Sequence, residues 1–462
     1  MTLITSISGI RGTIGGKIGE NLTPPDVVKF VTAYGSWIKN NKKEHHKVIV
    51  GRDARVSGQM VSHLVTATLN AMGIDVVDLG LSTTPTVEIA VPAEKADGGI
   101  IITASHNPMQ WNALKLLNSD GEFITGAEGE SIIAAAEKPN VEYADAKHLG
   151  KTTQDDSYLQ KHIDLILAMD LVDVDAIKKA NFRIVVDAVN STGGFAVPAL
   201  LKALGVEDIK KIHCEPSGLF AHNPEPLPEH LSELSSEVKH GRYDLGIAVD
   251  PDVDRLAFIC EDGSPFGEEY TLVAVADYIL SSKKTPTVSN LSSTRALRDI
   301  ARKHGVEHHA SAVGEVNVTT KMKAIGAAIG GEGNGGVIVS ELHYGRDALA
   351  GIALFLSHLA KKQMSICRLR NEYPNYHISK NKIELTPQIN VDKVLAEMEK
   401  KYSRQPTNTE DGVKIEFDKE WVHLRKSNTE PIIRIYTESD SEATANYLAN
   451  KIMQDIKEII AS

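Results

Sequence analysis

The stretch Lys47–Gly80 reads KVIVGRDARVSGQMVSHLVTATLNAMGIDVVDLG, and it decides the fold class of the chain. It begins with a β-branched run, passes through a turn rich in Ser, Gly and Arg, and continues as an amphipathic segment. Gly73 and a second β-branched run follow. A strand, a helix and a second strand within about 30 residues make a βαβ unit, the building block of a mostly parallel sheet.

The same arrangement returns at Phe182–Ile212 and at Pro286–Val313. Gly205 and Gly305 stand where Gly73 stands in the first copy, and glycine suits the left-handed residue that closes a helix. Because βαβ units are common, three unrelated α/β segments would also fit this pattern.

From about Asn371 the pattern changes. Short strand-like runs alternate with two helical segments, which predicts a separate α+β domain. The expected strands are KIELTPQ, GVKIEF, WVHLRK and PIIRIYT, and the expected helices lie near Val391–Tyr402 and Ser441–Ile460. We therefore predict three α/β domains at residues 1–155, 156–257 and 258–370, followed by an α+β domain at 371–462.

Composition disfavours several classes of protein. The formal net charge of −11 opposes sequence-independent binding to nucleic acid or to an anionic membrane. No run approaches the roughly 20 apolar residues that cross a bilayer, and the N-terminal residues lack the features of a signal peptide. The three cysteines are widely spaced, so we expect neither a disulfide framework nor a zinc site. We expect a cytoplasmic protein.

The strongest chemical signal is the group Asp250, Asp252 and Asp254 in the stretch YDLGIAVDPDVDRLAFI. In an extended segment alternate side chains share one face, so three mutually repelling carboxylates would need a cation. Hard oxygen ligands suit Mg²⁺, which often bridges to a phosphate. A calcium EF-hand loop does not fit, because Arg255 stands where its sharp turn requires glycine. A solvated acidic turn is the alternative.

Two further loops carry polar groups. The stretch GGEGNGG at Gly330–Gly336 contains a formal dinucleotide-binding pattern, but the following VIVSEL is typical of a strand and not of the required helix. Glu332 and Asn334 could instead hold hydroxyl groups, although a plain glycine-rich turn is equally compatible.

The stretch RKSNTEPIIRIY is the other loop, and it offers hydrogen-bond donors around a turn between two strands. Such donors suit a phosphate dianion, although Ser-Asn-Thr is also an ordinary turn composition. The donors are Arg425, Ser427, Asn428, Thr429 and Arg434.

Ser105 directly follows the apolar run GGIIITA and precedes Pro108. Proline disfavours helical backbone before it, so the serine is expected on a loop at the end of a strand, where open α/β sheets bind ligands. A serine hydrolase is disfavoured because the surroundings are not G-x-S-x-G. His106 is expected to point to the opposite face of an extended chain and to stabilise the turn.

Taken together, five motifs resemble the successive motifs of the α-D-phosphohexomutase superfamily, in the right order and along the whole chain. They are SGIRG at Ser8–Gly12, TASHNP around Ser105, DPDVDR at Asp250–Arg255, GEGNGG at Gly331–Gly336 and RKSNTEP at Arg425–Pro431. The resemblance implies an α/β fold, with three topologically similar α/β domains around a cleft and a C-terminal α+β domain.

The resemblance also implies a mechanism. Ser105 would be phosphorylated in the resting enzyme, and its phosphate would join the three aspartates around Mg²⁺. The phosphoserine would pass its phosphoryl group to a hydroxyl of a hexose phosphate, form a hexose bisphosphate, and receive the original phosphate back. Arg11 and Arg255 would neutralise charge, and Lys115 would take or give the hydroxyl proton. The glycine-rich loop would bind the sugar and the Arg425 loop its phosphate.

Departures from the family bear on the substrate. The sugar-binding motif of familiar phosphoglucosamine mutases resembles G-E-Q-S-G-H, whereas Gly333, Asn334 and Gly336 stand here at its variable positions. With DPDVDR in place of DGDGDR, the chain resembles a variant phosphoglucosamine mutase branch, which implies glucosamine 6-phosphate and 1-phosphate as substrates.

Phosphomannomutase or phosphoglucomutase activity is the alternative, and a monomer or homodimer is expected. A catalytically silent sugar-phosphate binding protein is disfavoured, because a binder needs neither Ser105 nor three aspartates.

Overall fold

The computed structural model describes residues 2–6, 9–40, 45–137, 141–385, 389–426 and 432–461. The chain divides into two compact units, each made of two segments. The first unit contains Met1–Tyr278 and Asn334–Leu369, and the second contains Ile279–Gly333 and Arg370–Ser462. Within the described ranges, every helix is too short or too polar to span a membrane.

The first unit begins with a seven-stranded sheet in the order β1-β2-β6-β5-β3-β4-β7. The central strand β3 runs parallel to β4 and β5, while β6 runs antiparallel to β5. These strands are β1 (Ile4–Ser6), β2 (Gly9–Thr13), β3 (His46–Arg52), β4 (Ile74–Leu81), β5 (Gly98–Ile102), β6 (Trp111–Leu117) and β7 (Thr152–Gln154). Helix α2 (Gly58–Ala71) joins β3 to β4, which confirms the βαβ unit predicted at Lys47–Gly80.

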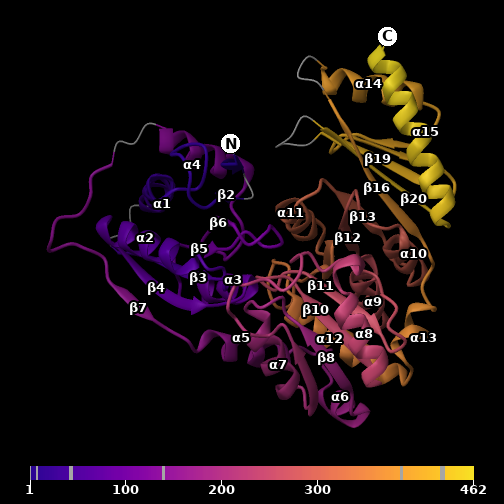
Figure 1. Ribbon diagram of the computed structural model, residues 1–462, viewed down its shortest axis with the longest axis horizontal. Coiled ribbons are helices and arrows are strands. Elements are labelled where there is room, and N and C mark those ends of the chain that lie inside the picture. Colours follow the sequence, from indigo (N-terminus) through magenta and orange to yellow (C-terminus); the bar gives the residue numbers. More distant parts are fainter. Residues whose placement is uncertain are drawn as a thin grey trace. The chain divides into compact units, whose positions relative to one another are not determined.

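Helices cover both faces of this sheet (Figure 1). On β3, Val48 and Val50 join the core cluster that contains residues of α1 (Pro24–Lys39) and α2, whereas Ile49 joins the cluster of α3 (Thr84–Ala93). Strands buried on both faces need continuous apolar runs, and VIVG in β3 and GGIII in β5 supply them. Helix α4 (Gly126–Glu137) packs beside α1.

A second, four-stranded sheet of the first unit has the order β11-β10-β8-β9. Strand β8 runs parallel to β9 and β10, and β11 runs antiparallel to β10. The strands are β8 (Arg183–Asp187), β9 (Asp208–Ile212), β10 (Leu245–Val249) and β11 (Leu256–Cys260). Helix α7 (Gly193–Ala203) joins β8 to β9, and α8 (Ser232–Gly241) precedes β10.

Further elements complete the first unit. Before the second sheet lie α5 (Tyr158–Leu167) and α6 (Val174–Ala180), and after it α9 (Glu268–Ser282) begins. The chain re-enters this unit with β15 (Gly336–Val339) and the largely buried α12 (Ala348–Lys362). It leaves the unit at the end of α13 (Ile366–Arg370).

The second unit contains the third βαβ copy. Strand β12 (Thr287–Asn290) runs parallel to both β13 (His308–Ser311) and β14 (Ile329–Glu332). Helices α10 (Ala296–Lys303) and α11 (Glu315–Ile325) connect them. In all three sheets the first strand of the copy therefore lies between the two strands that follow it in the chain, in the orders β4-β3-β5, β9-β8-β10 and β13-β12-β14. This shared order confirms the predicted repetition.

The C-terminal part of the second unit is a five-stranded antiparallel sheet in the order β16-β20-β19-β18-β17. Helices α14 (Val391–Lys401) and α15 (Glu442–Ala461) lie beside it (Figure 1) and share a hydrophobic core with it. The strands are β16 (His377–Glu384), β17 (Thr407–Asn408), β18 (Val413–Glu416), β19 (Trp421–Lys426) and β20 (Ile432–Ser439). The change to an α+β pattern is confirmed, while the exact domain boundaries stay a prediction.

Candidate active site

Ser105 lies just beyond the end of β5, in the left-handed backbone region with φ of 48°. Its backbone N–H donates to the Thr103 hydroxyl at 2.9 Å. The strand therefore ends before Ser105, which confirms the loop position expected for the serine, whereas the extended chain expected at His106 is wrong because a tight turn forms there. The turn brings His106 Nδ1 to 3.4 Å from Ser105 Oγ, and burial lowers the pKa of His106 well below its ordinary value.

The Ser105 loop is held by Arg55, a residue that sequence reasoning missed. The Arg55 guanidinium is buried, pairs with Asp53 at 3.0 Å, and donates to four backbone carbonyls of the loop. Those carbonyls belong to Ser105, Asn107, Pro108 and Trp111. One buried cation thus fixes the path of the whole turn.

Asp250, Asp252 and Asp254 are fully buried between β10 and β11, and each offers a carboxylate oxygen within 4.8 Å of the others. A tight turn, not an extended strand, makes them converge. Val253 has φ of 64°, and the backbone N–H groups of Asp254 and Arg255 both donate to Asp250 Oδ1 at 3.1 Å. A positive φ is rare for a β-branched residue, so this turn carries backbone strain.

Side chains on and next to the first sheet contact this acidic group. Ser105 Oγ donates to Asp250 Oδ2 at 2.7 Å, and the Thr84 hydroxyl donates to Asp252 Oδ2 at 2.7 Å. Lys115 Nζ, on β6, lies 2.7 Å from Asp252 and 3.4 Å from Asp254. The structure therefore places Ser105, Lys115 and the three aspartates in one site, within the first compact unit.

The charges of the site perturb one another. Burial and the neighbouring carboxylates raise the pKa of Asp250 well above its ordinary value. Burial also opposes the charge of Asp252, but Lys115 and the hydrogen bonds that Asp252 accepts outweigh it and hold the pKa of Asp252 below its ordinary value. The same carboxylates outweigh the burial of Lys115 and raise its pKa, so Lys115 is a cation at neutral pH.

The acidic group fits a divalent metal ion. Oδ1 of Asp252 and Oδ1 of Asp254 are buried and accept no hydrogen bond from the described residues. Buried acceptors without a donor are costly, and a cation would satisfy both. The donors are hard carboxylate oxygens of the kind that Mg²⁺ and Ca²⁺ prefer.

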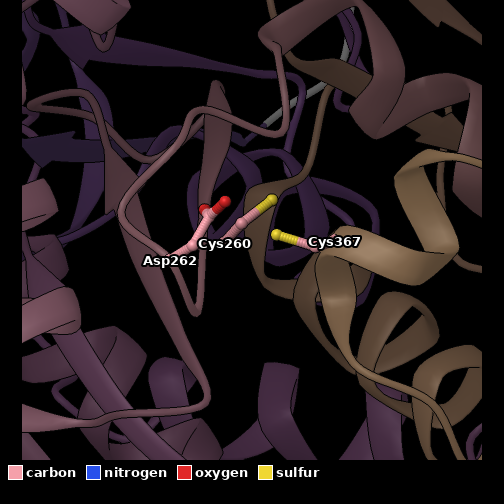
Figure 2. A group of neighbouring side chains, drawn as sticks. All are labelled: Cys260, Asp262 and Cys367. Atoms are coloured by element: carbon pink, nitrogen blue, oxygen red, sulfur yellow. The ribbon is translucent and has the colours of Figure 1, made fainter.

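A second group of potential ligands, Cys260, Asp262 and Cys367, is built differently. Figure 2 shows the two thiols facing each other beside the carboxylate of Asp262. That carboxylate already accepts from the backbone N–H and the hydroxyl of Ser264, at 2.8 and 2.6 Å. Burial raises the pKa of both thiols, so they are protonated and pack as neutral groups between β11 and α13.

The two arginines predicted beside Ser105 differ in their surroundings. Arg11, on β2, lies opposite Ala113 of β6, and its side chain shares a sheet face with Lys115 because alternate residues point the same way. The Arg255 guanidinium pairs with Glu225 at 2.7 Å, and only its backbone N–H contacts the acidic group directly.

The glycine-rich loop lies where the chain passes from the second unit back to the first. Glu332 ends β14, is buried, and accepts from the Asn290 amide at 2.8 Å and from the Gly314 N–H at 3.0 Å. Asn334 Oδ1 accepts from the Gly336 N–H at 3.2 Å. Both side chains are thus held in place by the local backbone or by a neighbouring amide.

In the C-terminal sheet, Arg425 of β19 and Arg434 of β20 are direct cross-strand partners. The Arg425 Nε lies 2.7 Å from Asp411 Oδ2. Like charges opposite each other are unfavourable, so an anion between them would be stabilising. Ser427, Asn428 and Thr429 lie outside the described residues.

Four domain models of one protein family match the chain in sequence order. They describe the α/β/α domains I, II and III and the C-terminal domain of phosphoglucomutase/phosphomannomutase, at residues 3–142, 158–263, 267–376 and 383–455. The chain belongs to the phosphoglucomutase/phosphomannomutase family. As a member of this phosphohexomutase family it is an isomerase, which confirms the predicted enzyme class.

Relatives of this phosphohexomutase match over nearly their full length. A phosphoglucomutase/phosphomannomutase from Thermococcus kodakarensis is 36% identical over 94% of this chain and 95% of its own. A phosphoglucosamine/phosphogalactosamine mutase from Sulfurisphaera tokodaii is 32% identical over 97% of this chain and 98% of its own. A crystal structure of a family protein from Burkholderia thailandensis has a TM-score of 0.85 and 26% identity, covering 99% of this chain and 98% of that chain.

Proposed function

We propose that this phosphohexomutase interconverts hexose 6-phosphate and hexose 1-phosphate through a phosphorylated Ser105 and a hexose bisphosphate. The observation that carries the proposal is the 2.7 Å hydrogen bond from Ser105 Oγ to Asp250 inside a buried group of three carboxylates. A plain sugar-phosphate binder would have no use for a serine held against such a group.

Asp250, Asp252 and Asp254 would hold Mg²⁺, and Oδ1 of Asp252 and Oδ1 of Asp254 accept no hydrogen bond from the described residues. When bound, Mg²⁺ supplies positive charge that stabilises the phosphoryl oxygens during transfer. Arg11 and Arg255 add positive charge near Ser105. Arg55 keeps the serine in place, because phosphoryl transfer depends mainly on positioning and charge.

In the transfer step the bond between phosphorus and Ser105 Oγ breaks, and a bond to the sugar hydroxyl oxygen forms with release of the hydroxyl proton. Lys115 is charged and close to the acidic group, so it is suited to give a proton to the serine oxygen as that oxygen leaves and then to take up the proton that the sugar hydroxyl releases. In the return step the serine gives the proton back.

Glu332 and Asn334 would bind the sugar hydroxyls. Arg425, Ser427, Asn428, Thr429 and Arg434 would hold the phosphate that is not being transferred. The cross-strand position of Arg425 and Arg434 supports an anion site at this end of the β19–β20 pair. Bidentate guanidinium contacts are well matched to phosphate.

For the sugar we propose glucosamine phosphate. The relative from Sulfurisphaera tokodaii, named for amino-sugar phosphates, supports this choice. The relative from Thermococcus kodakarensis, named for glucose and mannose phosphates, supports the alternative of phosphomannomutase or phosphoglucomutase activity. A cytoplasmic location and a monomeric or homodimeric state remain predictions.

Parallel turnover assays with the 1- and 6-phosphates of glucosamine, glucose and mannose test the proposal, with Mg²⁺ present and after its removal by a chelator. We expect Mg²⁺-dependent interconversion, with the highest kcat/KM for the glucosamine pair. Preference for mannose or glucose would support the alternative. Tight binding without turnover of any pair would instead identify a silent binding protein.

A further inference from the structure

Gly336, the first residue of β15, is needed for space and not for backbone freedom. Its φ lies outside the left-handed range in which other glycines of the chain are found. A Cβ atom at this position would lie 2.3 Å from Arg346 Cδ and 3.1 Å from Arg346 Cγ. Any larger residue at 336 would therefore displace the Arg346 side chain.

Arg346 uses that space to reach the acidic group. Its side chain is buried, and Nη2 donates to Asp254 Oδ2 at 2.7 Å. Asp254 Oδ2 also lies 3.4 Å from Lys115 Nζ. Arg346 and Lys115 therefore both contact Oδ2 of Asp254, while Oδ1 stays buried without a hydrogen bond from the described residues.

The segment that carries Arg346 is held firmly. The next residue, Asp347, caps α12 by accepting from the backbone N–H groups of Leu349 and Ala350 at 2.8 and 3.1 Å. The same carboxylate contacts His162 Nε2 at 2.8 Å and His343 Nε2 at 3.2 Å. These contacts of Asp347 hold the backbone that carries Arg346, so Arg346 is not a mobile surface arginine.

We propose that Arg346 is a positioning residue of the metal site, and that glycine at 336 makes room for it. By holding Oδ2, the guanidinium orients the Asp254 carboxylate so that Oδ1 is left for the metal ion. This inference rests on the proposed function, because it assigns Arg346 to the metal-dependent step of that mechanism. Groups that orient a metal ligand commonly contribute ten- to hundredfold to metal affinity.

Metal affinity distinguishes this role from a merely structural ion pair. Mn²⁺ can stand in for Mg²⁺, and its electron paramagnetic resonance signal falls as it binds. Titration of the whole chain should give a Kd that rises about tenfold or more in Arg346→Met. Arg346→Lys keeps the charge, so it should recover part of the loss. Thermal melting checks that each variant is folded.

A double-mutant cycle tests the link to Gly336. Gly336→Ala should weaken Mn²⁺ binding by pushing Arg346 away, and the double variant should bind no more weakly than Arg346→Met alone. Gly58→Ala is the matched control, because its new Cβ would lie 3.3 Å from Cδ of another arginine, Arg52, outside the proposed metal site. It should leave the Kd unchanged.

Two results would overturn the inference. One is a wild-type Kd for Mn²⁺ in folded Arg346→Met, and the other is multiplication of the two single effects in the double variant. Failure of the proposed function would look different, since the wild-type chain itself would then show no Mg²⁺-dependent turnover of any hexose phosphate.

Discussion

Ser105 Oγ lies 2.7 Å from Asp250 Oδ2, although 145 residues separate the two in the chain. The serine stands at the end of the first sheet and the aspartate at the end of the second. Ser191 reinforces this contact, since its hydroxyl donates to the Pro251 carbonyl at 2.7 Å and accepts from the Ala54 N–H at 3.3 Å. The candidate site therefore depends on both sheets and exists in neither alone.

Ser105→Ala should abolish mutase turnover, by more than about 10³-fold, because it removes the proposed phosphoryl carrier. The fold should persist, since the substitution deletes one hydroxyl at the end of a strand. Intact-mass measurement should find one phosphate on active wild-type protein and none on the variant. Near-normal turnover by the variant would rule out the phosphoserine mechanism.

Asp252→Asn should lower Mg²⁺ affinity by at least about tenfold and slow turnover, because one of three carboxylate charges is lost. Turnover measured against Mg²⁺ concentration would show the shift. Asp262→Asn is the matched control, since it removes one carboxylate charge beside Cys260 and Cys367, outside the proposed metal site. Equal responses of the two variants would mean that the acidic group is not the metal site.

Arg425→Ala should raise KM by a similar factor for every hexose phosphate, because phosphate is common to all of them. Asn334→Ser should instead change the relative kcat/KM for glucosamine and mannose phosphates. Kinetics with both sugars on both variants would decide between these effects. The assignment of phosphate binding to Arg425 and of sugar binding to Asn334 is wrong if Arg425→Ala changes sugar preference while Asn334→Ser does not.

Arg55→Lys should lower kcat by roughly 10²-fold, because lysine lacks the planar guanidinium that bonds four loop carbonyls at once. Ser105 would then be poorly held, and misplaced groups are costly in phosphoryl transfer. Single-turnover transfer from phosphorylated protein would measure the effect. Unchanged transfer would show that the loop keeps its shape without Arg55.

His343 should make stability depend on pH. It is partly buried and lies 3.3 Å from Glu88 and 3.2 Å from Asp347. Burial disfavours its charge, but these hydrogen-bonded carboxylates outweigh burial and raise the pKa of His343 to about 10. The raised pKa means that its stabilisation is complete below the unfolded value near 6.5 and is lost as pH rises through 10.

Denaturant unfolding of wild type and His343→Gln across this range would test the relationship. The variant should be less stable by roughly 3 kcal/mol at pH 6, and the difference should shrink toward pH 10. A difference that stays constant with pH would show that His343 is neutral in the folded protein.

Much of the fold could be predicted from the sequence because it depends on local patterns. The closing glycines Gly73, Gly205 and Gly305 do have positive φ, as expected for helix ends. Ser441, where the last helix was expected to begin, caps α15 by accepting from the Thr444 N–H at 3.2 Å. Such features involve residues close together in the chain, so their patterns can be recognised without coordinates.

The candidate site was harder to predict from the sequence than the fold. The alternation of Asp250, Asp252 and Asp254 suggested a shared face, but the carboxylates converge through a turn at Val253. Arg55 and Arg346 act on residues far along the chain, and a single arginine in a sequence does not show where it reaches. Gly336, at a position where the family's motif carries histidine, was the available signal for Arg346, and only the 2.3 Å approach explains it.

The left-handed backbone at Val253 holds the turn of the proposed metal site in one shape at a cost in strain. Glycine would avoid roughly 1 kcal/mol of that strain, but the Val253 side chain is fully buried. Val253→Gly would lose that packing, which costs more than the strain it relieves, so the melting temperature should fall. It would also let the segment between Asp252 and Asp254 sample other shapes. One valine side chain therefore links the stability of the fold to the spacing of two carboxylates in the proposed metal site.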